Sequence, residues 1–338
     1  MPEPIPYVYR EERDHNERVV GSLISQNMVK ETLDSDRLLY IHQPLSTNAP
    51  PGILILMDGE QEMRPGFAAK STPEIVDELY ENKKISPQVC VYIPAPQDRI
   101  REYACNEEFA NFLNNKLVPL LRKPPFGCSD CREQTTIVGT SFGGLAATHA
   151  ALTYPETFGN VLSQSGAFWW NEGWKGFDHP DKWTSASKTA KHETTQQAMA
   201  MKWLNEIPHK EGLSVNFYLS GGEIEENKTP SLNGESFPGA TTLNNELSTR
   251  LADRGHNVTT AITSGDHDYG SWQSDKPVAL QTLLPKPALQ QAADHEKAKQ
   301  YRDNLREMKR SDLEETSSNA ETEKFTPLPT TPKPPWEK

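Results

Sequence analysis

The chain has 338 residues, of which 35% are hydrophobic and 24% charged, and its formal net charge is −12. This acidity argues against nucleic acid or an anionic membrane as a partner, since both attract an excess of Lys and Arg. The sequence contains no run of about eighteen apolar residues, so it predicts no transmembrane helix. Residues 1–6 contain neither a basic nor an apolar segment of the secretory kind, so we expect a soluble, cytoplasmic protein.

Short apolar runs rich in β-branched residues alternate with helical patterns along the chain. The runs predict strands at 38–41, 53–57, 89–93, 135–138, 161–162, 215–219 and 258–262. Helices are predicted from Thr72, as N-cap with Pro73 at N1, from Asn106, after Phe142, and over 243–251. Strands that alternate with helices predict an α/β fold with a mostly parallel sheet covered on both faces.

The composition predicts three regions. Residues 1–285 are expected to form one α/β domain, in which 165–212 hold Trp169, Trp170, Trp174 and Trp183 among polar residues and form a cap-like insertion. Residues 286–310 are rich in Ala, Lys, Arg and Glu and predict a charged helical extension. Residues 311–338 are rich in Glu, Ser, Thr and Pro, which predicts a disordered tail.

The four cysteines give no strong signal. Cys128 and Cys131 have the spacing of a zinc knuckle, but no second Cys or His pair at a suitable distance completes a four-ligand site. We therefore expect no metal site, and a loop disulfide and free thiols both stay open for this pair. Cys90 lies in an apolar run and is expected in the core.

The most informative segment is Gly139-Thr140-Ser141-Phe142-Gly143, a G-x-S-x-G motif between a predicted strand and a predicted helix. A serine at such a turn has a constrained backbone and needs small neighbours. It presents its hydroxyl above the edge of the sheet, beside a helix N-terminus. The motif predicts Ser141 as a nucleophile and the Phe142 N–H as an oxyanion donor. A glycine-rich turn that holds a serine by chance is the alternative.

A serine hydroxyl needs a base, and His267 has the expected place after Ser141 in sequence and after a strand and a turn. An acid that orients the imidazole is expected just past the preceding strand, where Glu223, Glu225 and Glu226 are all candidates. A second oxyanion donor is expected in the loop after strand 53–57. There the Glu60 N–H is the candidate, and a plain turn is equally compatible with the segment.

Several spaced motifs together resemble the enterobactin (enterochelin) esterases, which open the trilactone of a catecholate siderophore. The motifs are Leu56-Met-Asp-Gly-Glu-Gln61, Arg99-Ile-Arg-Glu-Tyr-Ala-Cys-Asn-Glu-Glu-Phe109, Gly139 to Leu145 with Tyr154-Pro155 and Leu162-Ser-Gln-Ser-Gly166 followed by Trp169-Trp170, and Gly265-Asp-His-Asp268 before Trp272. The likeness covers roughly residues 20–285, far more than the serine motif alone.

The resemblance implies an α/β-hydrolase fold and a serine esterase that needs no metal or organic cofactor. Its substrate would be a small-molecule ester, most closely a catecholate siderophore such as enterobactin or its Fe(III) complex. It implies Ser141 as nucleophile, His267 as base and Glu225 as acid. Arg99 matches the arginine that lies in the substrate pocket of the family. A surface ion pair with Glu102 is the other interpretation of Arg99.

Trp169 and Trp170 are expected to line an aryl-binding wall, although tryptophans are as often core residues. The chain looks like a short, catalytic-domain-only form, because it has room for only a strand or two before the hydrolase domain. A feruloyl or acetyl carbohydrate esterase of the same superfamily is the alternative enzyme. A non-catalytic binding or virulence protein on a hydrolase scaffold is the alternative of another class. The oligomeric state stays open.

Overall fold

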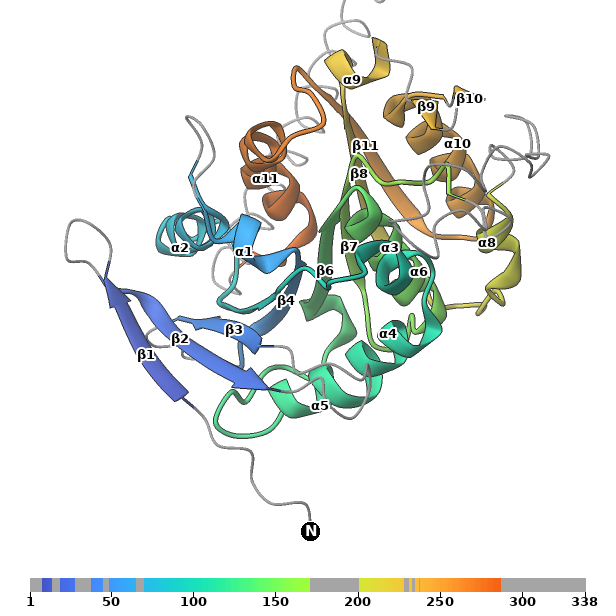
Figure 1. Ribbon diagram of the computed structural model, residues 1–338. Helices are drawn as coiled ribbons and strands as arrows, with labels where there is room; N and C mark the ends of the chain where they lie inside the picture. Colours follow the sequence, from blue (N-terminus) through green and yellow to red (C-terminus); the bar gives the residue numbers. More distant parts are fainter. Residues whose placement is uncertain are drawn as a thin grey trace, which may run out of the picture. The chain divides into compact units, whose positions relative to one another are not determined.

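One mixed sheet organises the domain (Figure 1). Nine of the described strands form it in the order β1-β2-β3-β5-β4-β6-β7-β8-β11. Their bounds are β1 Val8–Arg13, β2 Val19–Asn27, β3 Leu38–Gln43, β4 Gly52–Met57, β5 Gln88–Ile93, β6 Thr135–Thr140, β7 Asn160–Gln164, β8 Asn216–Gly222 and β11 Asn257–Thr263. Six strands run parallel, namely β4, β5, β6, β7, β8 and β11. Strands β1, β2 and β3 form antiparallel pairs at one edge of the sheet, with β3 next to β5. The predicted mostly parallel sheet is confirmed.

The computed structural model describes residues 8–13, 19–27, 38–44, 49–64, 70–170, 201–227, 231–232, 235–236 and 238–286. The chain divides into two units, Met1–Pro287 and Ala288–Lys338, and every described residue belongs to the first. The tail expected at 311–338, nearly all of the extension expected at 286–310, and residues 171–200 of the expected insertion therefore lie outside the described residues. Among the helices of the described part, none is long and apolar enough to cross a bilayer.

Helices lie on both faces of the sheet (Figure 1). Their bounds are α1 Gly59–Glu62, α2 Thr72–Glu81, α3 Arg99–Tyr103, α4 Glu107–Phe112, α5 Val118–Leu121, α6 Phe142–Thr153, α8 Lys202–Glu206, α9 Glu223–Asn227, α10 Ala240–Asp253 and α11 Tyr269–Leu283. A π-helical turn, Leu113–Leu117, joins α4 to α5, and a short hairpin pairs β9 (Ser231–Leu232) with β10 (Glu235–Ser236).

The two faces follow from the alternation of side chains along each strand. Ile53, Ile55 and Met57 of β4 belong to a core cluster with α4, α5, α6 and α10. Leu54 and Leu56 point to the opposite face and join a second cluster with α2 and α11. Every residue of β4 is buried, which is typical of a central parallel strand between two layers of helices.

The helices differ from the sequence expectations in one start point and in several elements that were not predicted, among them the short α1, α8 and α9. Ser71, not Thr72, is the N-cap of α2, because its side chain and that of Glu74 form a reciprocal capping box. Helix α3 was not predicted, since its five residues are too few for a periodic pattern. Helix α11 was also missed, because Pro277 lies inside it and obscures the helical signal.

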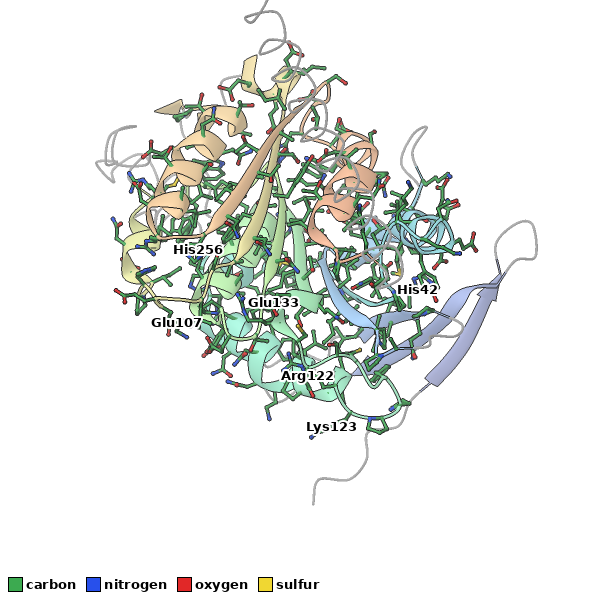
Figure 2. The ribbon with its side chains drawn as sticks, turned by 180° about the vertical axis from the view of Figure 1, so that it is seen from behind. His42, Glu107, Arg122, Lys123, Glu133 and His256 are labelled. Atoms are coloured by element: carbon green, nitrogen blue, oxygen red, sulfur yellow. The ribbon has the colours of Figure 1, made fainter. Side chains whose placement is uncertain are left out.

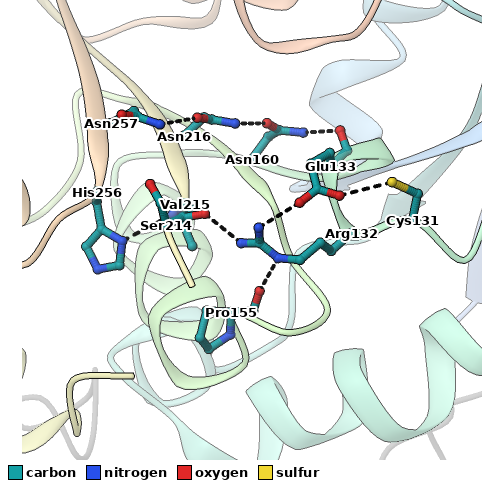
Figure 3. Close-up of polar contacts among 10 residues, drawn as sticks. All are labelled: Cys131, Arg132, Glu133, Pro155, Asn160, Ser214, Val215, Asn216, His256 and Asn257. Atoms are coloured by element: carbon teal, nitrogen blue, oxygen red, sulfur yellow. Dashed lines mark hydrogen bonds and ion pairs between the residues drawn. The ribbon is translucent and has the colours of Figure 1, made fainter. Parts of the chain in front are cut away.

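Cys131 and Glu133 lie just before β6, at the N-terminal ends of the parallel strands (Figures 2 and 3), whereas Ser141 follows the C-terminal end of β6. All four cysteines are free thiols, and Cys131 Sγ donates to Glu133 Oε2 at 3.0 Å. Within the described ranges, no group of three or more His, Cys, Asp or Glu could hold a metal ion. The neighbouring side chains instead brace the start of the sheet.

The brace has two parts (Figure 3). Asn257, Asn216 and Asn160 form a ladder of side-chain hydrogen bonds across the starts of β11, β8 and β7, at 2.9 Å for each step. Arg132 donates to the carbonyl oxygens of Pro155 at 2.6 Å and Ser214 at 2.7 Å. These contacts stabilise one end of the sheet and leave the opposite, C-terminal ends of the strands to carry the candidate site.

Candidate active site

Ser141 lies in a strained turn between β6 and α6. Its backbone has φ 55° and ψ −121°, which costs an L-residue on the order of 1–3 kcal/mol and is characteristic of functional turns. Neighbouring backbone holds the turn in place: the Ser141 N–H donates to the Gln164 carbonyl oxygen at 3.0 Å, and the Ala167 N–H donates to the Ser141 carbonyl oxygen at 2.9 Å. The serine is therefore presented by a fixed backbone.

Gly139 of the motif and Gly144, the residue after the motif, are required by close packing. A Cβ on Gly139 would lie 2.1 Å from the carbonyl oxygen of Gly143, and a Cβ on Gly144 would lie 2.4 Å from Ser163 Oγ. Neither position tolerates a side chain without a shift of the turn. The small residues therefore let the first turn of α6 approach the ends of β6 and β7.

The structure brings together Glu225 and His267. Glu225 Oε2 lies 2.9 Å from His267 Nδ1, and the carboxylate is buried at 6% exposure whereas the histidine side chain is half exposed. Glu225 comes from α9 at the end of β8, and His267 from the loop that follows β11 and leads into α11. Because a carboxylate only accepts hydrogen bonds, this contact favours the imidazole tautomer with its proton on Nδ1 and a free lone pair on Nε2.

The other two acidic candidates lie elsewhere. Glu226 accepts from the Thr241 N–H at 2.8 Å and from the Thr242 hydroxyl at 2.5 Å, so it caps the N-terminus of α10. Glu223 is exposed on α9. The residues alone left three glutamates open, and the geometry singles out Glu225 as the partner of His267.

The loop Asp58–Glu62, which contains α1, follows β4 and is called the oxyanion loop because it carries the Glu60 N–H, the second oxyanion donor predicted from the sequence. Asp58 has a left-handed backbone, φ 54° and ψ 45°, which turns the chain sharply at the end of the strand. The Glu60 N–H lies in the first turn of α1, and the Phe142 N–H lies in the first turn of α6, where helical N–H groups lack a helical acceptor. The Glu60 carboxylate accepts from the Ala95 N–H at 2.9 Å.

Arg99 contacts Asp58 of the oxyanion loop. Its Nε and Nη2 donate to Asp58 Oδ1 at 2.8 Å and Oδ2 at 2.7 Å, a bidentate pair. Nη2 also donates to the carbonyl oxygen of Thr140 at 3.1 Å. Arg99 thus bridges the oxyanion loop to the residue before Ser141. Its side chain remains 30% exposed and lines a cavity.

Two cavities meet at Ser141 and His267. The first, about 300 Å³, is mainly apolar and is lined among others by Trp169, Pro238 and Leu243. The second, about 460 Å³, is charged and is lined by Asp58, Glu60, Gln61, Arg64, Ala95, Arg99, Thr140, Ser141, His267, Tyr269 and Trp272. An ester placed over the serine would therefore have an apolar side and a charged side.

The structure separates the two adjacent tryptophans. Trp169 lines the apolar cavity and packs edge-on against the Phe142 ring, with centroids 5.4 Å apart. Trp170 is buried in the core cluster and lines neither of the two cavities. Trp169 is therefore the member of the pair placed to contact a bound ester.

Sequence reasoning missed Tyr269 and Arg64, which line the charged cavity. Burial, followed by the negative charge of Asp58, raises the pKa of Tyr269, so this phenol stays neutral. Its position two residues after His267 is the one signal that would have pointed to it. Trp272, singled out only as a motif residue, packs edge-on against His267 at 5.0 Å and donates its Nε1–H to Ser165 Oγ.

Two other histidines are unsuited to serve as the base. Burial lowers the pKa of His149 to about 4, and His149 lies inside α6. Burial also lowers the pKa of His256 to about 4, and its Nδ1 accepts from the Val215 N–H at the far end of the sheet (Figure 3). The position beside both Glu225 and the Ser141 cavities belongs to His267.

The sheet order, the helices on both faces and the strained serine turn define an α/β-hydrolase. A solved structure of enterochelin esterase from Shigella flexneri has this fold in common with the chain, with a TM-score of 0.55 and 24% identity. The match covers 84% of this chain and 59% of the Shigella flexneri chain. The family described as "Putative esterase" matches residues 30–283, and the chain belongs to this esterase family.

Curated relatives carry the likeness in sequence. The iron(III) enterobactin esterase of Escherichia coli (strain K12) is 39% identical over 123 residues, which cover 35% of this chain and 29% of the relative. The iron(III) salmochelin esterase of Escherichia coli O6:H1 is 26% identical over 243 residues, 70% of this chain and 51% of the relative. The chain therefore spans about half or less of the length of these two relatives. The resemblance drawn from the motifs is confirmed.

Proposed function

We propose that the chain is a carboxylic ester hydrolase that uses Ser141, His267 and Glu225. One observation carries the proposal: Ser141, in its strained turn, and His267 border the same two cavities, and Glu225, which contacts His267, lines the apolar one. His267 Nε2 takes the proton of the serine hydroxyl as Ser141 Oγ attacks the ester carbonyl carbon. The Phe142 and Glu60 N–H groups bind the oxyanion, and water later releases the acyl-enzyme.

Glu225 supports this step through charge as well as orientation. Its buried carboxylate accepts a hydrogen bond from the Nδ1–H of His267 and stabilises the imidazolium that forms when the serine loses its proton. The desolvated position makes this interaction stronger than it would be in water. Protonated His267 then returns its proton to the leaving alcohol, so atoms and charge balance over the cycle.

As substrate we propose a catecholate siderophore ester, free or as its Fe(III) complex. The chain's relatives are named for iron(III) enterobactin and iron(III) salmochelin. The two cavities are compatible with such a molecule, since the apolar one has an aromatic wall in Trp169 and the charged one contains the guanidinium groups of Arg64 and Arg99. Iron would enter only as part of the substrate.

A hydrolysis panel tests the proposal. The panel compares a catecholate trilactone, a feruloyl sugar and a short p-nitrophenyl ester, each with wild type and with Ser141→Ala. We expect wild type to favour the trilactone by kcat/KM and Ser141→Ala to lose on the order of 10⁴–10⁶ in kcat on every substrate hydrolysed. Preference for the feruloyl sugar would move the substrate to carbohydrate esters. No hydrolysis by wild type would support a binding protein on a hydrolase scaffold.

A further inference from the structure

Each acidic side chain of the oxyanion loop is anchored to a different part of the fold. Asp58 pairs with Arg99 of α3, and Glu60 accepts from the N–H of Ala95 beyond β5. Glu62 accepts from Lys276 Nζ of α11 and from the hydroxyl of Thr72 in α2. The loop that carries the Glu60 N–H is therefore held from three sides.

The anchor at Glu62 differs from the others because water is excluded. Glu62, Lys276 and Thr72 are all 0% exposed. Both donors converge on one carboxylate oxygen, Oε2, while Oε1 has no hydrogen-bond partner among the described residues. Burial of two charges is costly, and an apolar pair of similar volume often stabilises a fold equally well. Stability alone therefore gives a poor reason for this pair.

Helix α11 connects this anchor to the base. It begins two residues after His267, and its Trp272 packs edge-on against the His267 ring. One turn before Lys276, Gln273 Nε2 donates to the carbonyl oxygen of Arg64 at 2.7 Å, just past the oxyanion loop. Figure 1 shows α1 next to α2 and α11, the two helices that supply its buried partners. One helix thus carries the base at its start and grips the oxyanion loop farther along.

We propose that Glu62 and Lys276 are positioning residues for ester hydrolysis, which fix the Glu60 N–H relative to Ser141 and His267. Neither side chain lines the two cavities, so neither touches the ester. A directional ion pair holds the loop in one place, whereas an apolar pair permits it to slide. This inference rests on the proposed function, because it assigns a role to the oxyanion loop in that reaction.

The test uses Glu62→Leu/Lys276→Met, which removes both charges together and leaves no unpaired ion in the core. We expect a urea midpoint close to that of wild type, a kcat lower by about 10- to 100-fold, and a KM within about threefold. Ground-state binding depends on the cavities and is retained, whereas oxyanion stabilisation depends on the loop. The split between kcat and KM distinguishes positioning from loss of fold.

Leu121→Ala is the matched control. Leu121 is fully buried in α5, and the segment after it contacts Pro51 at the start of β4, the end of the sheet away from Ser141. This variant should lower the urea midpoint while kcat per folded molecule stays at the wild-type value. A kcat of Glu62→Leu/Lys276→Met within about threefold of wild type would overturn the proposal. An equal loss of kcat in Leu121→Ala would overturn it as well.

Hydrogen exchange separates this inference from the proposed function. In Glu62→Leu/Lys276→Met, the amides of residues 58–64 should exchange at least about tenfold faster than in wild type. Exchange elsewhere in the sheet should be unchanged. If wild type hydrolysed no ester but exchange rose in this loop, the proposed function would fail and the positioning contact would stand. Unchanged exchange in residues 58–64 would overturn the positioning role itself.

Discussion

Replacement of Arg99 by Ala removes the cation that faces a buried carboxylate. The Asp58 side chain is 3% exposed and receives two hydrogen bonds from the guanidinium, at 2.8 and 2.7 Å. The Thr140 carbonyl oxygen loses a donor at the same time. Arg99→Ala is therefore expected to disturb both segments that carry the proposed oxyanion donors, in addition to any contact with substrate.

The magnitude follows from the burial of Asp58. Loss of one partner from a buried ion pair costs about 3–5 kcal/mol. Because 30% of the Arg99 side chain is exposed and water can enter after its removal, we expect the lower end, about 3 kcal/mol. Asp58→Asn/Arg99→Ala leaves a neutral amide in place of the charge, which costs about 1–3 kcal/mol when unpaired. Asn also tolerates the left-handed backbone of position 58, so the double variant should be the more stable of the two.

Urea unfolding of wild type, Asp58→Asn, Arg99→Ala and the double variant measures this coupling as a double-mutant cycle. The family resemblance alone predicts a loss confined to catecholate esters, whereas the Asp58 contact predicts that Arg99→Ala also loses turnover of a short p-nitrophenyl ester. In the double variant, a remaining deficit of about tenfold on the catecholate alone would measure direct recognition by Arg99. A urea midpoint for Arg99→Ala equal to that of wild type would show that the Arg99–Asp58 pair does not stabilise the fold.

Glu225→Gln should lower kcat by about 10²–10⁴, because the imidazole loses its orienting charge, whereas Glu226→Gln should lower only stability and leave kcat unchanged. Steady-state kinetics and urea unfolding of both variants check this prediction. The opposite pattern would make Glu226 the acid. His149 is protonated below about pH 6.5 in the unfolded chain but only below about pH 4 in the folded chain. The free energy of unfolding should therefore fall on acidification between these values, by up to about 1.4 kcal/mol per pH unit. Urea unfolding of His149→Leu at several pH values should show a flatter slope, and an unchanged slope would contradict the burial of His149. Trp169→Ala should raise KM for aryl esters by about 5- to 30-fold with kcat less affected, and an unchanged KM would remove Trp169 from the site.

The sequence predicted features that depend on short stretches of chain. The seven predicted strands are present, because buried parallel strands show as short β-branched runs. The serine turn is equally local, since its glycines are adjacent in sequence and pack on one another. The acid required more: the residues left three glutamates open, and only the family motif favoured Glu225, which the structure places against His267.

Long-range pairs were beyond the sequence. Arg99 and Asp58 are 41 residues apart, and Lys276 and Glu62 are 214 residues apart. No local pattern indicates that such charges meet in the core, because each one alone is typical of a solvated surface. Nothing in the sequence distinguished Trp169 from Trp170, whereas in the structure Trp169 lines a cavity and Trp170 lies in the core.

The proposed function requires that Ser141 is a nucleophile activated by His267. A fluorophosphonate reacts only with such an activated serine, and mass spectrometry of the intact chain and its peptides counts and locates the adduct. We expect one adduct per chain, on Ser141, no adduct in Ser141→Ala, and a rate lower by about 10³ or more in His267→Ala. An adduct on another residue, or labelling of His267→Ala at the wild-type rate, would contradict the proposed function.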